Sequence, residues 1–139
     1  MKTMLTPLKR YADFDGRASR SEYWLFQLLL ALLTIPFNAL MTFALYDDST
    51  GLTLAFAVLA LLLLLLIALA VPLVAVTVRR LHDIDQSGWW VSVLFLPFVP
   101  ATHMNFKLLL LAFILLLLVF MLLPGTRGEN RFGPPVPHR

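Results

Sequence analysis

The sequence predicts an all-α integral membrane protein that crosses the bilayer four times, and three observations carry this prediction. Hydrophobic residues occupy 60% of the 139 positions, and the mean hydropathy is +0.84, whereas soluble domains are roughly 45 to 50% apolar. Long apolar runs contain no charged residue. The basic residues gather between these runs, as they do at membrane surfaces. We therefore expect residues 1–139 to form a single membrane domain.

The first predicted span follows a polar N-terminal segment, residues 1–22. Met4, Leu5 and Leu8 could rest on the membrane surface as a short amphipathic turn. We favour a mobile tail instead, because the segment falls short of the roughly 12 residues that a stable isolated helix needs. Ser19 and Glu22 fit a capping box, in which the Ser19 hydroxyl accepts from the Glu22 amide and the Glu22 carboxylate reaches back. Residues 23–45 carry no charge and exceed the roughly 20 residues that cross a bilayer. They form the first predicted transmembrane helix.

The second uncharged run covers residues 52–78, which is long enough to cross with some tilt. Charged residues follow it immediately and are too dense to lie in hydrocarbon, so residues 79–88 are predicted to form a loop at the membrane surface. If the helix continues into this stretch, Asp83 can pair with Arg79, four residues earlier, or with Arg80, three residues earlier.

The third predicted span, residues 89–101, is short and contains Pro97 and Pro100. At 1.5 Å per residue it covers about 20 Å of a hydrocarbon core of roughly 30 Å, so it is either a thin span or a re-entrant segment. Gly88, just before it, suits a turn with a positive dihedral angle. Residues 106–123 are apolar except for Lys107 at the start and form the fourth predicted span.

The distribution of basic residues predicts the topology. With four crossings and a cytoplasmic N-terminus, the tail at residues 124–139 is also cytoplasmic and Lys107 is the only basic residue outside. The cytoplasmic side then holds Lys2, Lys9, Arg10, Arg17, Arg20, Arg79, Arg80, Arg127, Arg131 and Arg139. With three crossings, the arginines of the tail would face outward. The positive-inside rule therefore favours four helices with both termini in the cytoplasm.

Composition excludes several classes of function. The chain has no cysteine, which excludes disulfides, thiolate metal sites and cysteine nucleophiles. The net charge of +3 does not indicate nucleic-acid binding, because the basic residues flank apolar runs instead of lining one face. Such flanking charge is typical of contact with anionic lipid. The polar residues inside the predicted spans are uncharged, so no intramembrane carboxylate is available to couple ion transport.

Three charged motifs gather on the predicted cytoplasmic side. They read FDGRASRSEYW at residues 14–24, RRLHD at 79–83 with SGWW at 87–90, and PGTRGENRFG at 124–133. These motifs resemble those of the Domain of Unknown Function 805 family of small bacterial inner-membrane proteins, and the resemblance extends from about residue 11 to residue 133. It implies a location in the bacterial cytoplasmic membrane and supplies no activity.

Two interpretations of these motifs remain open. In the structural interpretation, arginines pair with carboxylates and fix the helix ends in a cytoplasmic cap, to which the planar guanidinium is well suited. In the binding interpretation, excess arginine at headgroup level binds anionic lipid or phosphate. Both use the same candidate residues, which are Arg17, Arg20, Glu22, Arg79, Arg80, His82, Asp83, Asn130 and Arg131.

Two further function classes compete with a non-enzymatic scaffold or interaction partner. His82 and Asp83 are weak catalytic candidates for lipid-phosphate hydrolysis, as a general base or metal-ligand pair. A metal usually needs three or more ligands, and the other histidines, His103 and His138, lie elsewhere in the predicted topology. We therefore predict no metal and no cofactor. An oligomeric pore for a neutral solute is the other class, and the expected partners are membrane lipids, further copies of the chain or a larger membrane complex.

Overall fold

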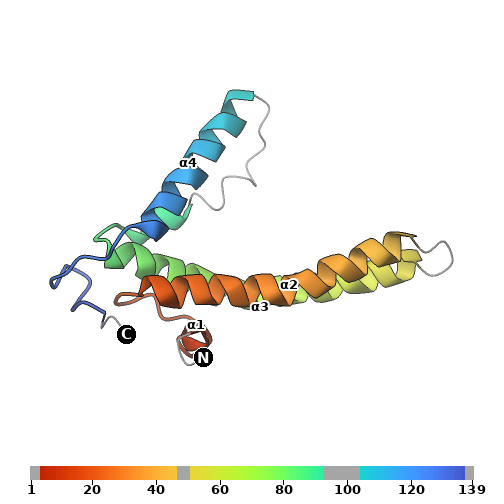
Figure 1. Ribbon diagram of the computed structural model, residues 1–139, viewed down its shortest axis with the longest axis horizontal. Helices are drawn as coiled ribbons and strands as arrows, with labels where there is room; N and C mark the ends of the chain where they lie inside the picture. The colour runs from red at the N-terminus through yellow and green to blue at the C-terminus, as the bar shows by residue number, and fades with distance from the viewer. Residues whose placement is uncertain (1–3, 47–50, 93–103, 137–139) are drawn as a thin grey trace.

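The computed structural model describes residues 4–46, 51–92 and 104–136, and within them the chain is helical without strands. The helices are α1 (Thr6–Lys9), α2 (Arg20–Tyr46), α3 (Gly51–Asp83) and α4 (Met104–Leu122) (Figure 1). The prediction of an all-α fold is confirmed.

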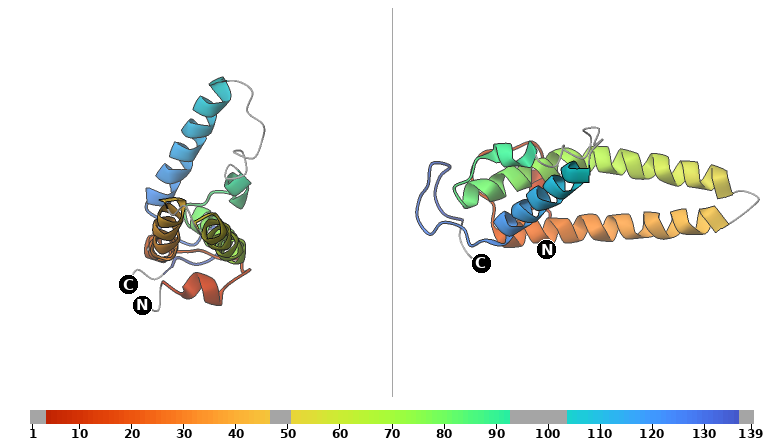
Figure 2. Two further views of the ribbon diagram at one scale, coloured as in Figure 1. Left: turned by 90° about the vertical axis from the view of Figure 1, so that its right-hand side faces the viewer. Right: turned by 90° about the horizontal axis from the view of Figure 1, so that it is seen from above.

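Helices α2 and α3 lie side by side as a long antiparallel hairpin (Figures 1 and 2). Both are long and apolar enough to cross a membrane, and α4 contributes a shorter apolar stretch. These three helices cover most of the predicted spans at 23–45, 52–78 and 106–123. The C-terminal end of α4 lies at the end of the hairpin where α2 begins and α3 ends. The rest of α4 points away from the hairpin (Figure 1).

Of the two hydrogen bonds of the capping box predicted at the start of α2, only one forms. The amide of Glu22 donates to the Ser19 hydroxyl over 3.2 Å, so Ser19 is the N-cap. The Glu22 carboxylate does not complete the capping box, because it turns toward Arg79 of α3 at 3.0 Å. The attraction of a buried cation therefore wins over the local hydrogen bond.

Helix α3 continues five residues past Val78, through the RRLHD motif, before it ends at Asp83. Its end is a Schellman motif, in which the amide of Gln86 donates to the Leu81 carbonyl and that of Asp85 to the His82 carbonyl. Asp85 takes the left-handed conformation (φ 59°) that usually falls to glycine. The charged motif is therefore mostly helical, and only its last residues form the turn.

The predicted third span, residues 89–101, falls largely outside the described residues. Residues 88–92 form a single tight helical turn, and the Trp90 ring packs edge-on against Phe120 of α4, with centroids 5.5 Å apart. Gly88 does not have the positive dihedral angle predicted for it. It is instead a point of close approach, since a Cβ there would lie 2.8 Å from a methyl group of Val78.

The N-terminal segment is ordered against the hairpin, so the expectation of a mobile tail is wrong for its described part. Pro7 in α1 is fully buried, and Leu8 packs against the apolar core. The Tyr11 hydroxyl also donates to the Ala68 carbonyl of α3 at 2.5 Å. Contacts with the hairpin thus order a segment that is too short to be a stable helix alone.

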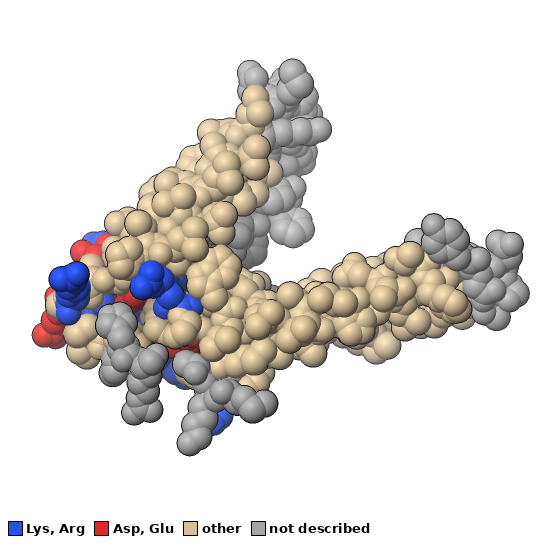
Figure 3. Space-filling model, viewed as in Figure 1, with Lys and Arg blue, Asp and Glu red and all other residues tan. Residues whose placement is uncertain are grey.

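The buried core lies at the end of the hairpin that carries the charges. Its apolar members come from the N-terminal segment, the three long helices and the turn at residues 88–92. They are Ala18, Tyr23, Phe26, Val76, Leu81, Val91, Leu117 and Met121. Toward the other end, Phe43 and Leu64 are each 65% exposed. Figure 3 shows this uncharged surface along the visible length of the hairpin and α4. Exposed apolar area of this extent is typical of a surface that contacts lipid or other protein chains.

Candidate functional site

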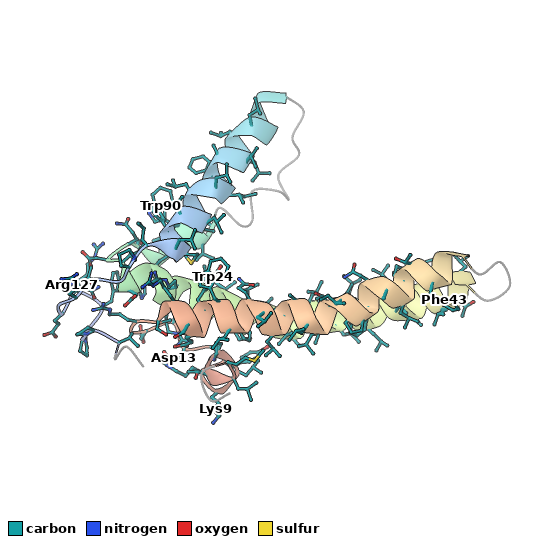
Figure 4. All side chains as sticks on the ribbon, viewed as in Figure 1. Lys9, Asp13, Trp24, Phe43, Trp90 and Arg127 are labelled. Carbon is teal, nitrogen blue, oxygen red and sulfur yellow. The ribbon has the colours of Figure 1, made fainter. Side chains whose placement is uncertain are left out.

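The three charged motifs meet at one end of the molecule, where Figure 3 shows the charged side chains gathered. We call this region the arginine cap and define it as residues 13–22, 79–87 and 123–133. Its parts come from the loop before α2, the last turn and a half of α3 with the following turn, and the tail after α4. The tail carries Arg127 at the outer edge of this end (Figure 4).

Asp83 is the centre of the arginine cap. Its carboxylate accepts a hydrogen bond from Arg17 Nε at 2.9 Å through one oxygen and from Arg80 Nη1 at 2.5 Å through the other. The side chains of all three residues are at most 7% exposed. Two guanidinium groups sharing one carboxylate leave a net positive charge, which neighbouring backbone carbonyls offset.

The tail after α4 supplies those carbonyls to Arg17. Arg17 Nη2 donates to the Thr126 carbonyl at 2.6 Å, and Nη1 donates to the Gly128 carbonyl at 2.8 Å. In return, the Thr126 amide donates to the Asp83 carbonyl at 2.9 Å. The tail is therefore bonded to both members of the Arg17–Asp83 pair.

Arg80 binds the last turn of α4. Its Nε donates to the Met121 carbonyl at 3.3 Å, and its Nη2 donates to the Leu123 carbonyl. The final carbonyls of a helix lack partners within the helix and carry partial negative charge, so a guanidinium there is doubly favourable. Arg80 thus fixes the end of α4 to the end of α3.

A second buried ion pair joins α3 to α2. Arg79 is fully buried, and its Nη1 lies 3.0 Å from Glu22 Oε1. Within the described residues, no nitrogen of this guanidinium has a hydrogen bond of good geometry. The backbone of Arg79 also fixes the loop before α2, because its carbonyl accepts from the Ala18 amide at 2.9 Å.

The ring of His82 contacts both the loop before α2 and the tail after α4. Its Nδ1 is 3.2 Å from the Gly16 carbonyl, and its ring stacks on Phe132 with centroids 3.8 Å apart and planes 3° from parallel. Asn130 donates to the His82 carbonyl at 2.9 Å and to the Thr126 hydroxyl at 3.0 Å. These contacts give both His82 and Asn130 structural roles in holding the tail.

The remaining candidates lie on the outside of the arginine cap. Arg131 pairs with Asp85 at 3.1 Å, where both side chains are about half exposed or more, and its guanidinium lies 5.1 Å from the centroid of the Phe132 ring. Arg20 is exposed at the start of α2. These two arginines, unlike Arg17, Arg79 and Arg80, present charge to the surroundings.

The structure thus brings together the predicted residues Arg17, Arg80, His82, Asp83 and Asn130, and it pairs Glu22 with Arg79 beside them. Sequence reasoning did not single out Thr126 or Phe132, although both stand in the third motif. It also missed why Gly125 is needed, namely that a Cβ there would overlap the Asp83 carboxylate. In the described part of the chain, no three His, Asp or Glu side chains form a group that could hold a metal ion.

Comparisons with known proteins give a family and a membrane location. A family model described as "Protein of unknown function (DUF805)" matches residues 11–134, which include all three motifs. The chain is 37% identical to "Inner membrane protein YhaI" of Escherichia coli strain K12 over 133 residues, covering 96% of this chain and 93% of that protein. It is 34% identical to "Inner membrane protein YhaH" of the same strain over 137 residues, covering 96% and 95%.

No solved structure matches the chain. The family match covers the loop before α2, the RRLHD turn and the tail that together build the arginine cap, and the two relatives are both named as proteins of the inner membrane. The chain belongs to the DUF805 family of bacterial inner-membrane proteins of unknown function.

Proposed function

We propose that this protein is a non-enzymatic scaffold of the inner membrane that crosses it four times with both termini in the cytoplasm. In this proposal the arginine cap is a fixed surface at the cytoplasmic face, available to a partner in a larger complex or to further copies of the chain. The observation that carries it is the sharing of the Asp83 carboxylate by Arg17 and Arg80 while the Asp83 carbonyl binds Thr126.

This arrangement supports a structural role, because the Asp83 carboxylate and one ring nitrogen of His82 are already engaged. A general base must present a free lone pair toward a substrate. The two oxygens of Asp83 each accept from a buried guanidinium, and His82 has one ring nitrogen at the Gly16 carbonyl and one face on Phe132. Base catalysis by Asp83 would require the arginine cap to come apart.

We propose that the exposed cations, and not the buried ones, contact lipid headgroups. Arg17, Arg79 and Arg80 are at most 6% exposed and cannot reach a headgroup. Arg20 and Arg127 are exposed and lie on the charged end of the hairpin, so we assign to them the attraction for anionic headgroups that charge at a membrane surface produces. Arg20→Ala with Arg127→Ala should lower the anionic lipid that copurifies with the protein, while the matched surface change Glu129→Ala should not.

Site-specific photo-crosslinking in native membranes tests the scaffold function. A photoreactive residue at Arg127 or Glu129 should give one adduct of constant mass with a protein neighbour. The same residue at Phe43, on the exposed far half of α2, should give lipid adducts. Adding Asp83→Asn should abolish the protein adduct, because the tail would lose its fixed position.

Two sets of results would contradict the scaffold proposal. Absence of a protein adduct at the arginine cap, together with phosphate release from a lipid phosphate by purified protein that His82→Gln abolishes, would replace the scaffold with the enzyme. Solute flux through reconstituted protein, with no protein adduct and no hydrolysis, would show that the protein is a pore and not a scaffold.

A further inference from the structure

A proline in α3 leaves one backbone carbonyl without its normal partner. Pro72 lies inside α3 and has no N–H, so the Ala68 carbonyl, four residues earlier, cannot form the helical hydrogen bond. A carbonyl without a partner in or near hydrocarbon is strongly destabilising. The sequence alone indicates only that the helix lacks one backbone hydrogen bond at Pro72.

Tyr11 supplies the missing donor. Its hydroxyl donates to the Ala68 carbonyl at 2.5 Å across 57 residues of sequence. Pro72 itself is fully buried, as is Pro7 in the short helix α1 that packs on α3. The N-terminal segment is therefore bonded to α3 at the proline, and not merely adsorbed on it.

The position of this bond along α3 gives its depth in the membrane. The 17 residue-to-residue steps from Gly51 to Ala68 rise about 25 Å, and a hydrocarbon core of roughly 30 Å extends to about Val71 if it starts at Gly51. Ala68 and Pro72 then lie on either side of the hydrocarbon boundary at the charged end of the hairpin. Tyrosine is enriched at this level because its ring is apolar and its hydroxyl polar.

The outward surface of the N-terminal segment combines apolar and charged side chains, as expected at the hydrocarbon boundary. Leu5, Tyr11 and Phe14 are 40 to 45% exposed, and Lys9 projects from α1 beside the hairpin (Figure 4). Asp13 is hydrogen-bonded to Arg10 at 2.7 Å, which lowers the pKa of its carboxyl and keeps it charged. Apolar side chains beside a cation are typical of segments that lie in the plane of the interface and favour anionic lipid.

We infer that residues 5–14 form an interfacial segment that lies on the anionic surface of the membrane and is held at the hydrocarbon boundary by the Tyr11–Ala68 hydrogen bond. The inference goes beyond the scaffold function, since it requires only that the hairpin spans the membrane. Its partner is the lipid surface itself.

Spin-label depth measurements on the full chain in vesicles test this inference. The chain has no native cysteine, so Leu5→Cys can carry a single nitroxide, and collisions with oxygen are compared with collisions with a water-soluble nickel chelate. In vesicles of phosphatidylethanolamine and phosphatidylglycerol, the label at position 5 should favour oxygen, unlike a label at Glu129→Cys, an exposed position in the tail. Equal nickel accessibility at both positions overturns the interfacial placement.

Tyr11→Phe tests the hydrogen bond, because it removes the hydroxyl and keeps the ring. It should raise the population of the released segment roughly fivefold, the effect of one net hydrogen bond, and nickel accessibility at position 5 should rise with it. Tyr23→Phe is the matched control, since its hydroxyl contacts Gln27 within α2. An unchanged depth in Tyr11→Phe overturns the role of Tyr11.

Pro72→Ala separates the proposed cause from simple packing. The new amide at position 72 can bond to the Ala68 carbonyl, so Tyr11→Phe should have little further effect in this background. A full effect of Tyr11→Phe in Pro72→Ala contradicts the assignment of the freed carbonyl. Replacing phosphatidylglycerol by phosphatidylcholine should also raise nickel accessibility at position 5, and no change overturns the preference for anionic lipid.

Discussion

Arg17 and Asp83 form a buried hydrogen-bonded ion pair of 2.9 Å although 66 residues separate them in the sequence. The pair joins the loop before α2 to the end of α3, and the tail after α4 bonds to both partners. Three segments that have no local reason to meet are therefore held by one carboxylate.

Asp83→Asn should destabilise the protein strongly, because it leaves the Arg17 and Arg80 guanidiniums buried without their shared counter-charge. Loss of one partner from a buried ion pair costs about 3 to 5 kcal/mol. Thermal unfolding in detergent measures the change. Asp85→Asn is the control, because its pair with Arg131 is exposed and such pairs contribute at most about 1 kcal/mol. Equal losses in both variants would contradict the central role of Asp83.

Glu22→Gln should destabilise the contact between α2 and α3, because the fully buried Arg79 guanidinium loses the carboxylate 3.0 Å away. We expect a loss of roughly 3 kcal/mol, and the double change Glu22→Leu with Arg79→Met should recover most of it, since apolar pairs often replace buried ion pairs without loss. The midpoints of thermal unfolding of both variants decide this. A double variant less stable than Glu22→Gln would show that the charges themselves are required.

Gly125→Ala should destabilise the arginine cap through a steric overlap. The added Cβ would overlap the Asp83 carboxylate, and two hydrogen-bonded arginines prevent that carboxylate from moving aside. Overpacking of this kind costs about 1 to 3 kcal/mol. Proteolysis of the tail should become faster. Gly128→Ala is the control, because a Cβ there meets nothing within 4 Å in the described structure, and a comparable rate in that variant would refute the steric explanation.

A green fluorescent protein fused after Arg139 should be fluorescent, because this reporter folds in the cytoplasm and the four-crossing topology places the C-terminus there. A fusion at Asp48, between α2 and α3, should be dark. A dark fusion at both positions would mean an odd number of crossings, which would separate the tail motif from Arg17 and Asp83 across the membrane and contradict the arginine cap.

The sequence alone was enough to predict the all-α membrane fold and the approximate extent of the long helices. Uncharged runs of about 20 residues have one stable conformation in hydrocarbon, since a helix satisfies every backbone polar group within itself. The N-cap at Ser19 was also predictable from its spacing to Glu22. Spacing along α3 limited the helical partners of Asp83 to Arg79 or Arg80, and the structure selects Arg80.

Only the tertiary structure decided which partners the charged residues take over long separations. Glu22 pairs with Arg79 instead of completing the capping box, and Arg17 pairs with Asp83. Tyr11 donates to the Ala68 carbonyl, which Pro72 leaves without a helical partner. Spacing within a helix carries no information about these choices, because several arginines and carboxylates were equally available by sequence. Burial decides among them, since an unpaired charge or carbonyl away from water costs more than any local hydrogen bond returns.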